Sequence, residues 1–198
     1  MDEFKRLTKD ETNAIYRRIY AYVGEIVCEW NEVEGEMGKI FQMCMNPDPR
    51  YPAALPFWTI QGFRGMLDAT GAAVKALCFK EAKLIEEWTE IRSKLEKANK
   101  IRNKIAHGGI WHELPRDRDQ NANDIFLTTS GEKQQDNHYA EVRGEPGAKR
   151  YPTPESKMRV YDLAAIPTMI RERTTELKIF HESIWVTFEA TYFNLDRR

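Results

Sequence analysis

The amino-acid sequence predicts a mainly α-helical protein, a bundle of four long helices with a small antiparallel β insertion before the last helix. Two observations predict this fold class. Apolar residues recur at spacings of three and four over long stretches, the period that places side chains on one face of a helix. Residues 108–161 instead hold short β-branched and aromatic runs between turn-forming residues. At 198 residues, the chain is expected to form a single domain.

The first helix is expected from about Thr8 to Met45, after which the proline-rich stretch "NPDPRYP" ends it. Its apolar stripe consists of Ile15, Ile19, Tyr22, Ile26, Trp30, Val33, Met37, Ile40 and Cys44. Gly24, Gly35 and Gly38 lie inside this helix, where each glycine costs about 1 kcal/mol relative to alanine. We therefore expect a neighbouring backbone to lie close to the helix at these positions.

Two further helices are expected before the insertion. The second spans roughly residues 57–79, with a stripe made of Ile60, Phe63, Leu67, Val74 and Leu77. The third spans roughly residues 81–107, with a stripe made of Leu84, Trp88, Ile91, Leu95, Ala98, Arg102 and Ile105. Gly108 and Gly109 follow, and glycine supplies the left-handed conformation in which many helices end. This pattern places Arg102 on the buried face of the third helix.

The insertion contains three runs typical of strands, "DIFLTT", "HYAEVR" and "KMRVY", separated by glycine- and proline-containing stretches. They predict an antiparallel sheet of two to four strands within residues 108–161. The last helix is expected from about Asp162 or Pro167 to Tyr192. Pro167 is expected either in its first turn or at a kink.

The formal net charge of −1 argues against a protein that binds nucleic acid over its whole surface. The charges are nevertheless distributed unevenly. Residues 91–107 contain one acidic residue, Glu96, and six basic residues: Arg92, Lys94, Lys97, Lys100, Arg102 and Lys104. Basic charge is therefore concentrated on the third predicted helix.

The cysteine content indicates a reducing compartment. Cys28, Cys44 and Cys78 stand far apart within apolar helical patterns, so we expect them to be small buried hydrophobic residues. The first residues are charged, and no run of about 18 apolar residues occurs. We expect a cytoplasmic protein without membrane contact. Most of the five tryptophans lie on apolar stripes and are predicted to be core residues.

The sequence "RNKIAH" ends the third predicted helix, and two interpretations of it are open. In the first, the histidine interacts favourably with the helix dipole, by a few tenths to about 1 kcal/mol, and the nearby lysines form a solvated face. In the second, Arg102, Asn103 and His107 are the working parts of a site.

Helix geometry allows the second interpretation. Asn103 and His107 are four residues apart, so the Asn103 amide can hydrogen-bond the imidazole and fix its tautomer. Arg102 lies about 140° around the helix axis from His107 and about 7.5 Å along it, which a long side chain covers. A guanidinium on an apolar seam needs an acidic partner, a dimer mate or an anion, because an unpaired buried charge is unfavourable.

These residues resemble the motif of HEPN domains, in which an arginine is usually followed by a polar residue and, a few positions later, by a histidine near the end of a helix. The following "GGIW", the long first helix with "EWNEVEGEM" and the β insertion also look like bacterial members of this family. The resemblance implies a single HEPN-like helical domain over residues 1–198. It also implies a metal-independent endoribonuclease that acts on RNA in a toxin-antitoxin, phage-defence or RNA-processing setting.

The resemblance implies roles for individual residues. His107 is expected to be the general base or acid at the ribose 2′-OH or the leaving oxygen, Arg102 to stabilise charge developing on phosphorus, and Asn103 to orient them. The expected RNA-binding residues are Lys97, Lys100 and Lys104. The family also implies a homodimer in which two motifs face each other, with a cognate antitoxin or a nucleotidyltransferase as a further partner.

An alternative function is a non-catalytic helical interaction module, antitoxin-like or part of a defence complex, that binds RNA or protein through the basic third helix. No dinucleotide, P-loop, zinc-protease or hydrolase motif is present, and no Glu-x-x-His pair supports a di-iron site. We therefore expect no cofactor and no metal. His112, His138 and His181 are isolated, and His181 is expected to be a satisfied, semi-buried residue.

Overall fold

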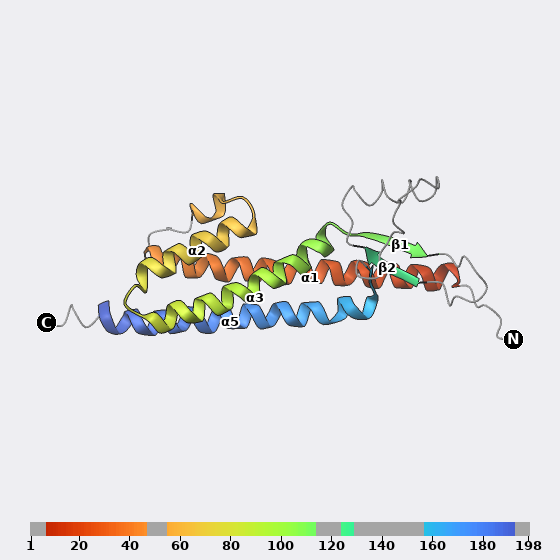
Figure 1. The fold of residues 1–198 in the computed structure, drawn as a ribbon. Helices are drawn as coiled ribbons and strands as arrows, with labels where there is room; N and C mark the ends of the chain where they lie inside the picture. The colour runs from red at the N-terminus through yellow and green to blue at the C-terminus, as the bar shows by residue number, and fades with distance from the viewer. Residues whose placement is uncertain (1–6, 47–54, 114–123, 129–156, 193–198) are drawn as a thin grey trace, which may run out of the picture. The chain divides into compact units, whose positions relative to one another are not determined.

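The computed structural model describes residues 7–46, 55–113, 124–128 and 157–192. Within these ranges the protein is mainly helical, which confirms the predicted fold class (Figure 1). The helices are α1 (Lys9–Met45), the short 3₁₀ helix η1 (Phe57–Thr59), α2 (Phe63–Leu77), α3 (Ala82–Ala106) and α5 (Val160–Tyr192). The strands are β1 (Gly109–Glu113), β2 (Asp124–Thr128) and β3 (Lys157–Met158).

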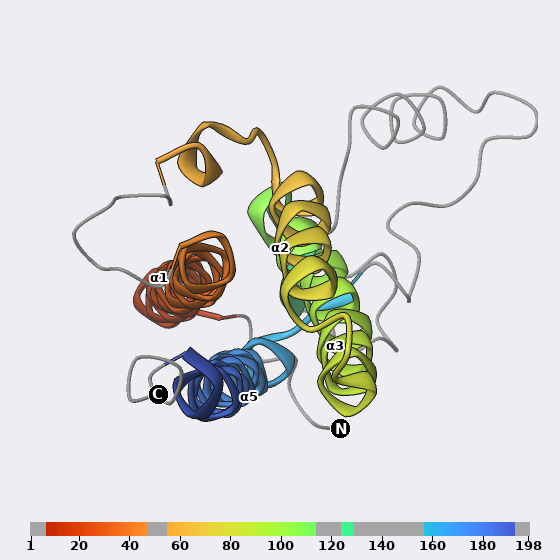
Figure 2. The same cartoon turned by 90° about the vertical axis from the view of Figure 1, so that its left-hand side faces the viewer.

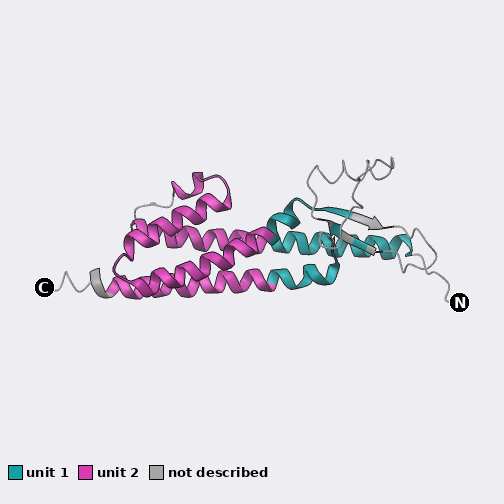
Figure 3. Ribbon diagram, viewed as in Figure 1, with its two compact units in different colours: residues 1–27, 101–167 teal, residues 28–100, 168–198 magenta. Residues whose placement is uncertain are grey.

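The chain forms two compact units (Figure 3). Unit 1 comprises residues 1–27 and 101–167, and unit 2 comprises residues 28–100 and 168–198. Unit 1 contains the β strands and the RNKIAH motif, whereas unit 2 contains helical segments from α1, α2, α3 and α5. The expectation of one domain over residues 1–198 stays a prediction.

The core of unit 2 lies between its four helical segments, which Figure 2 shows side by side and nearly end-on. Trp88 of α3 is 1% exposed and packs against Phe180 of α5, with ring centroids 5.6 Å apart. Trp30 of α1 is fully buried and packs against Phe63 of α2, with centroids 4.7 Å apart. Burying such a side chain contributes roughly 1.5–3 kcal/mol, so these contacts explain why the apolar stripes face inward.

Side chains cap the first turns of the two longest helices, α1 and α5. At the start of α1, the Thr8 backbone N–H donates to the Glu11 carboxylate over 2.7 Å, and the Glu11 N–H donates to Thr8 Oγ1 over 3.2 Å. At the start of α5, the Arg159 N–H donates to Asp162 Oδ2 over 2.7 Å. Such bonds satisfy N–H groups that have no partner inside the helix.

The start of α5 corrects two expectations. The run "KMRVY" was predicted as a strand, but only Lys157–Met158 is one, because the contact between Arg159 and Asp162 begins the helix at Val160. Pro167 consequently lies about two turns inside α5 and not in its first turn.

The prediction of one continuous helix over residues 57–79 is wrong, because this stretch forms two separate helices. A 3₁₀ helix ends at Thr59, Ile60 is extended, and α2 begins only at Phe63. Gly62, between them, has a φ of +81°, a conformation that L side chains rarely adopt. The glycine therefore supplies the turn that separates the two helices.

The glycines inside α1 also differ from expectation. A Cβ built on Gly24 or Gly35 would have nothing within 4 Å among the described residues, so none of their neighbouring backbone lies close to these glycines. A Cβ on Gly38 would lie 2.7 Å from the Trp58 ring. The close neighbour at Gly38 is therefore a side chain of η1 and not a backbone.

Two glycine-to-alanine changes should have opposite effects on stability. In Gly24→Ala, the helix gains backbone order without a clash, so the free energy of unfolding should rise by about 0.5–1 kcal/mol. In Gly71→Ala, the new Cβ would lie 2.9 Å from Nε1 of the buried Trp88, so the free energy of unfolding should fall by about 1 kcal/mol or more. Denaturant-induced unfolding of both variants measures this difference. An equal stabilisation by both changes would contradict the packing described around Trp88.

The sheet of unit 1 confirms the predicted antiparallel insertion. β2 pairs with β1, opposing Trp111 to Phe126, and with β3, opposing Leu127 to Met158. Ile125 and Leu127 are buried, as expected for alternate residues of a strand with one covered face. The strand β1 was not predicted, and the run "HYAEVR" lies outside the described residues.

The predicted burial of cysteine and tryptophan holds only in part. Cys78 is buried, Cys44 is half-buried and Cys28 is exposed, so the prediction is wrong for Cys28. Burial raises the pKa of Cys44 to about 12 and that of Cys78 to about 11. Trp58 and Trp185 are 52% and 40% exposed, whereas Trp30 and Trp88 are core residues and the Trp111 side chain lies outside the description. None of the described helices is both long and apolar enough to cross a membrane.

Candidate functional site

Residues 102–106 of the RNKIAH motif form the end of α3, and His107 follows directly after the helix, all in unit 1. The His107 N–H donates to the Asn103 carbonyl over 3.1 Å, and the Gly108 N–H donates to the Ile105 carbonyl over 3.1 Å. Among the described residues only Gly62 has a positive φ, so the expected left-handed ending at Gly108 and Gly109 is wrong. The chain passes directly from this turn into β1, which begins at Gly109.

Arg102 is half-buried and has no carboxylate partner among the described residues. Its Nη1 donates to Asn103 Oδ1 over 3.1 Å. Its Nε is buried and has no hydrogen-bond partner in the described part of the chain. A buried donor without a partner costs about 1–3 kcal/mol, so the guanidinium is held in an unfavourable state in the free protein.

Arg92 lies on α3 ten positions before Arg102 and shows how an arginine with a structural role is paired in this protein. Its Nη2 donates to Asp68 Oδ1 over 2.5 Å, and its Nε donates to Glu96 Oε1 over 3.2 Å. The hydrogen bond to Asp68 raises the pKa of Arg92 most, and the contact with Glu96 raises it further. Arg92 joins α3 to α2, whereas Arg102 makes no ion pair in the described part of the chain.

The Asn103 side chain lies differently from the arrangement that helix spacing suggested. Its oxygen accepts the hydrogen bond from Arg102, and no side-chain bond joins it to His107 in the described ranges. A hydrogen bond from a charged donor such as the guanidinium is stronger than one between neutral groups, which accounts for the contact with Arg102. In this structure Asn103 positions Arg102, and only its backbone carbonyl contacts His107.

His107 is exposed at the end of the helix. No hydrogen bond or ion pair involves its imidazole within the described residues. Its ring nitrogens are therefore open to solvent, as a group that exchanges protons with a substrate requires. The end of α3 in unit 1 thus carries the half-buried Arg102, which has no ion-pair partner among the described residues, and the exposed imidazole of His107 follows it.

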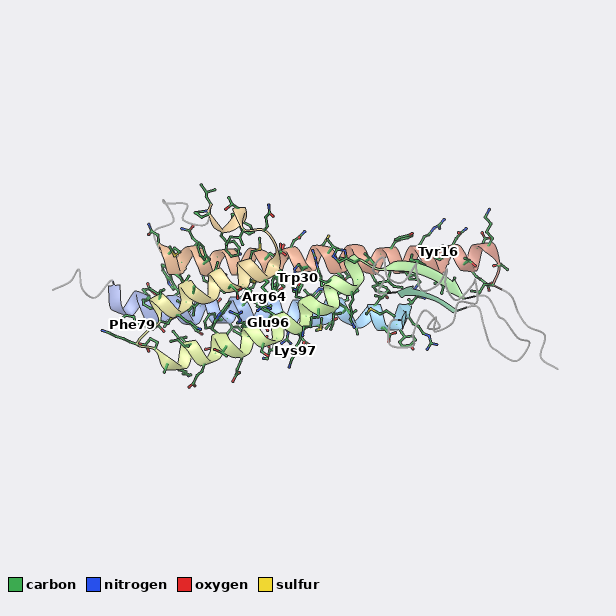
Figure 4. All side chains as sticks on the ribbon, turned by 45° about the horizontal axis from the view of Figure 1, so that its top comes forward. Tyr16, Trp30, Arg64, Phe79, Glu96 and Lys97 are labelled. Atoms are coloured by element: carbon green, nitrogen blue, oxygen red, sulfur yellow. The ribbon has the colours of Figure 1, made fainter. Side chains whose placement is uncertain are left out.

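The predicted RNA-binding lysines are all exposed. Lys97 and Lys100 belong to unit 2, Lys104 belongs to unit 1, and none of them has an ion-pair partner in the described ranges. Figure 4 labels Lys97 beside Glu96 on α3. The spacing of three and four residues places the lysines along one side of this helix.

The basic charge of residues 91–107 is partly neutralised by other helices. Lys94 Nζ lies 2.8 Å from Glu176 Oε1 of α5, and Arg92 pairs with Asp68 of α2. The sequence does not identify Asp68 and Glu176 as partners of α3, because nothing in the local pattern around either residue marks it as one. Within residues 91–107, the cations without an ion-pair partner among the described residues are therefore Lys97, Lys100, Arg102 and Lys104.

No group of three or more His, Cys, Asp and Glu side chains that would hold a metal ion occurs in the described part of the chain. His181 is half-buried, and burial lowers its pKa, with Lys39 adding to this effect and Glu36 opposing it. The side chain of His112 and all of His138 lie outside the described residues. The RNKIAH motif is thus the candidate site, because it combines an arginine that has no described carboxylate partner with an exposed histidine.

Comparisons with protein-family models, curated proteins and solved structures found no match to this chain. The resemblance to HEPN domains therefore rests on the sequence features named above, with the RNKIAH motif first among them. Membership of that family stays a prediction. The expected partners, namely RNA, a second copy of the chain and a cognate antitoxin or nucleotidyltransferase, also stay predictions.

Proposed function

We propose that this protein is a metal-independent endoribonuclease of the HEPN type that acts on RNA in a toxin-antitoxin or phage-defence system. The observation that carries the proposal is Arg102, a half-buried guanidinium that has no carboxylate partner among the described residues, whereas Arg92 of the same helix has two. A phosphate group offers the oxygen acceptors that this guanidinium lacks. The exposed imidazole of His107 lies at the same helix end.

The proposed reaction uses the ribose of the RNA as its nucleophile. His107 takes the proton of the 2′-OH, and the 2′ oxygen attacks the adjacent phosphorus. The bond from phosphorus to the 5′ oxygen breaks, and that oxygen takes a proton from the His107 of a second copy in a homodimer. The products are a 2′,3′-cyclic phosphate and a 5′-OH.

Arg102 and Asn103 have supporting roles in this reaction. The guanidinium stabilises the negative charge that develops on the phosphoryl oxygens in the transition state. Asn103 Oδ1 holds the Nη1 end of Arg102 at 3.1 Å, which leaves Nη2 for the phosphate, since Nε is buried. This fixed position lowers the cost of ordering the long side chain when RNA binds.

The alternative is a non-catalytic module that binds RNA or protein through α3. It is favoured by the exposure of Lys97, Lys100 and Lys104 and by their lack of ion-pair partners in the described ranges. Such a module would bind RNA with strong salt dependence and leave it intact.

RNA cleavage should survive an excess of EDTA, because the proposed mechanism uses only protein side chains. The measurement is a gel assay of labelled RNA with and without chelator, together with mass analysis of the product ends. A His107→Ala protein purified in the same way controls for contaminating ribonuclease. Loss of activity in EDTA with recovery on adding magnesium would contradict the proposal, and binding without cleavage by the wild type would favour the alternative.

A further inference from the structure

The first half of α1, in unit 1, has an unusual distribution of charge. Residues 12–24 contain no Asp or Glu, although the chain has 31 such residues in 198. The same stretch contains two arginines and three tyrosines. The next twelve residues of the helix reverse this pattern, since they carry Glu25, Glu29, Glu32, Glu34 and Glu36 and no basic residue.

One side of this half of α1 is open to solvent. We call this side the Arg17 face, and it consists of Ala14, Arg17, Arg18, Tyr20, Ala21 and Gly24, all exposed. The opposite side holds Ile19 and Ile26, which are buried. Figures 1 and 4 show the sheet strands running alongside this part of α1, with Tyr16 labelled in Figure 4. The helix therefore packs by one side and leaves the Arg17 face uncovered by the described residues.

The two arginines of this face are not part of an ion-pair network. Neither Arg17 nor Arg18 has an ion pair or hydrogen bond to a described residue. Along the helix the nearest carboxylates are Glu11, six positions before Arg17, and Glu25, seven positions after Arg18. At 1.5 Å per residue these acids lie about 9 Å or more away along the axis, beyond the range of a salt bridge.

Tyr20 adds an aromatic surface beside these charges. It is 66% exposed, among the most exposed large apolar side chains of the described residues. On a helix Tyr20 is three positions from Arg17 and therefore its neighbour. The small residues Ala14, Ala21 and Gly24 lie between the long side chains, and a Cβ on Gly24 would meet nothing within 4 Å.

We infer that the Arg17 face is a contact surface for single-stranded RNA, on which Arg17 and Arg18 bind backbone phosphates and Tyr20 stacks on an unpaired base. Cationic side chains beside exposed aromatic rings are the combination that binds single strands without sequence preference. A duplex would engage the arginines alone, because its bases are already stacked. The inference rests on the proposed ribonuclease function, since it gives unit 1 a second contact for the same RNA and selects unpaired substrates.

Binding to a labelled single-stranded oligouridylate tests this inference, measured by fluorescence anisotropy at several salt concentrations. All proteins carry His107→Ala so that the RNA stays intact. The double change Arg17→Gln with Arg18→Gln should reduce the slope of log K against log salt by about 1.4, since each phosphate contact on a single strand contributes about 0.7. Tyr20→Ala should weaken binding by about fivefold or more for the single strand and leave duplex binding unchanged.

A matched control removes the same charge elsewhere. Lys75→Gln with Lys83→Gln changes two exposed lysines of unit 2 and should leave the salt slope nearly unchanged. Equal effects of the two double variants, or equal loss of duplex and single-strand binding in Tyr20→Ala, would overturn the inference. Binding to vesicles of anionic lipid but not to RNA, lost in the Arg17 and Arg18 variant, would overturn it in favour of a membrane surface.

Cleavage by the otherwise wild-type protein separates this inference from the proposed function. If RNA is cleaved and the Arg17 and Arg18 variant binds it as the wild type does, the inference fails and the ribonuclease proposal stands. If RNA is bound through the Arg17 face and never cleaved, the ribonuclease proposal fails while the contact surface stands.

Discussion

Replacing Arg102 with leucine should lower the rate of RNA cleavage by about 100- to 1,000-fold, the effect expected when a group that stabilises transition-state charge is removed. The same change should leave the free energy of unfolding unchanged or raise it. The reason is that no described carboxylate pairs with Arg102, so its removal leaves no buried anion behind. Leucine also fills a position on an apolar seam and removes the unpaired Nε.

Arg92→Leu is the matched control, because it changes the same residue type on the same helix. It removes the partner of Asp68 and Glu96, so it should lower the free energy of unfolding by up to about 1 kcal/mol for these partly exposed pairs. Cleavage by the folded Arg92→Leu protein should match the wild type. Thermal melts and a cleavage assay on both variants decide the question. An Arg102→Leu protein destabilised by about 3–5 kcal/mol would instead indicate a structural ion pair.

Replacing His107 with alanine should lower the rate of cleavage by about 100- to 10,000-fold, the range contributed by general acid-base catalysis. The imidazole is exposed and has no partner among the described side chains, so the change should have little effect on folding. Binding of RNA should persist, because the cations of the same unit are unchanged. A cleavage assay and an RNA-binding assay on one preparation separate these two effects.

His181→Ala provides the comparison for this result. His181 is half-buried in unit 2, where burial lowers its pKa, and it has no role in the proposed reaction. The folded His181→Ala protein should therefore cleave RNA at the wild-type rate. If the His107→Ala protein still cleaves RNA, His107 has no catalytic role, and the RNKIAH motif is a helix end at which the histidine only interacts with the helix dipole.

Local sequence determined the helices most fully. The start of α1 was predicted at about Thr8 and lies at Lys9, where Thr8 and Glu11, three residues apart, cap the helix. The apolar stripes of α1 and α3 were predictable for a similar reason, since the helix period alone assigns residues such as Trp30 and Trp88 to the inner face. The sequence likewise predicted that the RNKIAH motif lies at the end of the third helix, which is where α3 ends.

Other features depended on residues that are distant in the sequence. Trp58 follows the buried Phe57 in η1, and its exposed ring covers Gly38 of α1, a contact that no local pattern encodes. Gly62 separates η1 from α2 because its φ is +81°, a conformation set by the path that the chain must take. The second helix was predicted to run without a break through Gly62, because the spacing of apolar residues gives no information on the direction of the backbone.

For the candidate site, the sequence by itself determined that basic charge is concentrated in residues 91–107 and that Arg102, Asn103 and His107 lie within six residues at the end of α3. Only the tertiary structure decided which of those charges are already paired. Arg92 meets Asp68 from 24 positions away, and Lys94 meets Glu176 from 82 positions away, whereas Arg102 meets no described carboxylate at all. Helix spacing is a local property of the chain, but neutralising a charge requires a partner brought from another helix, and that depends on how the helices pack.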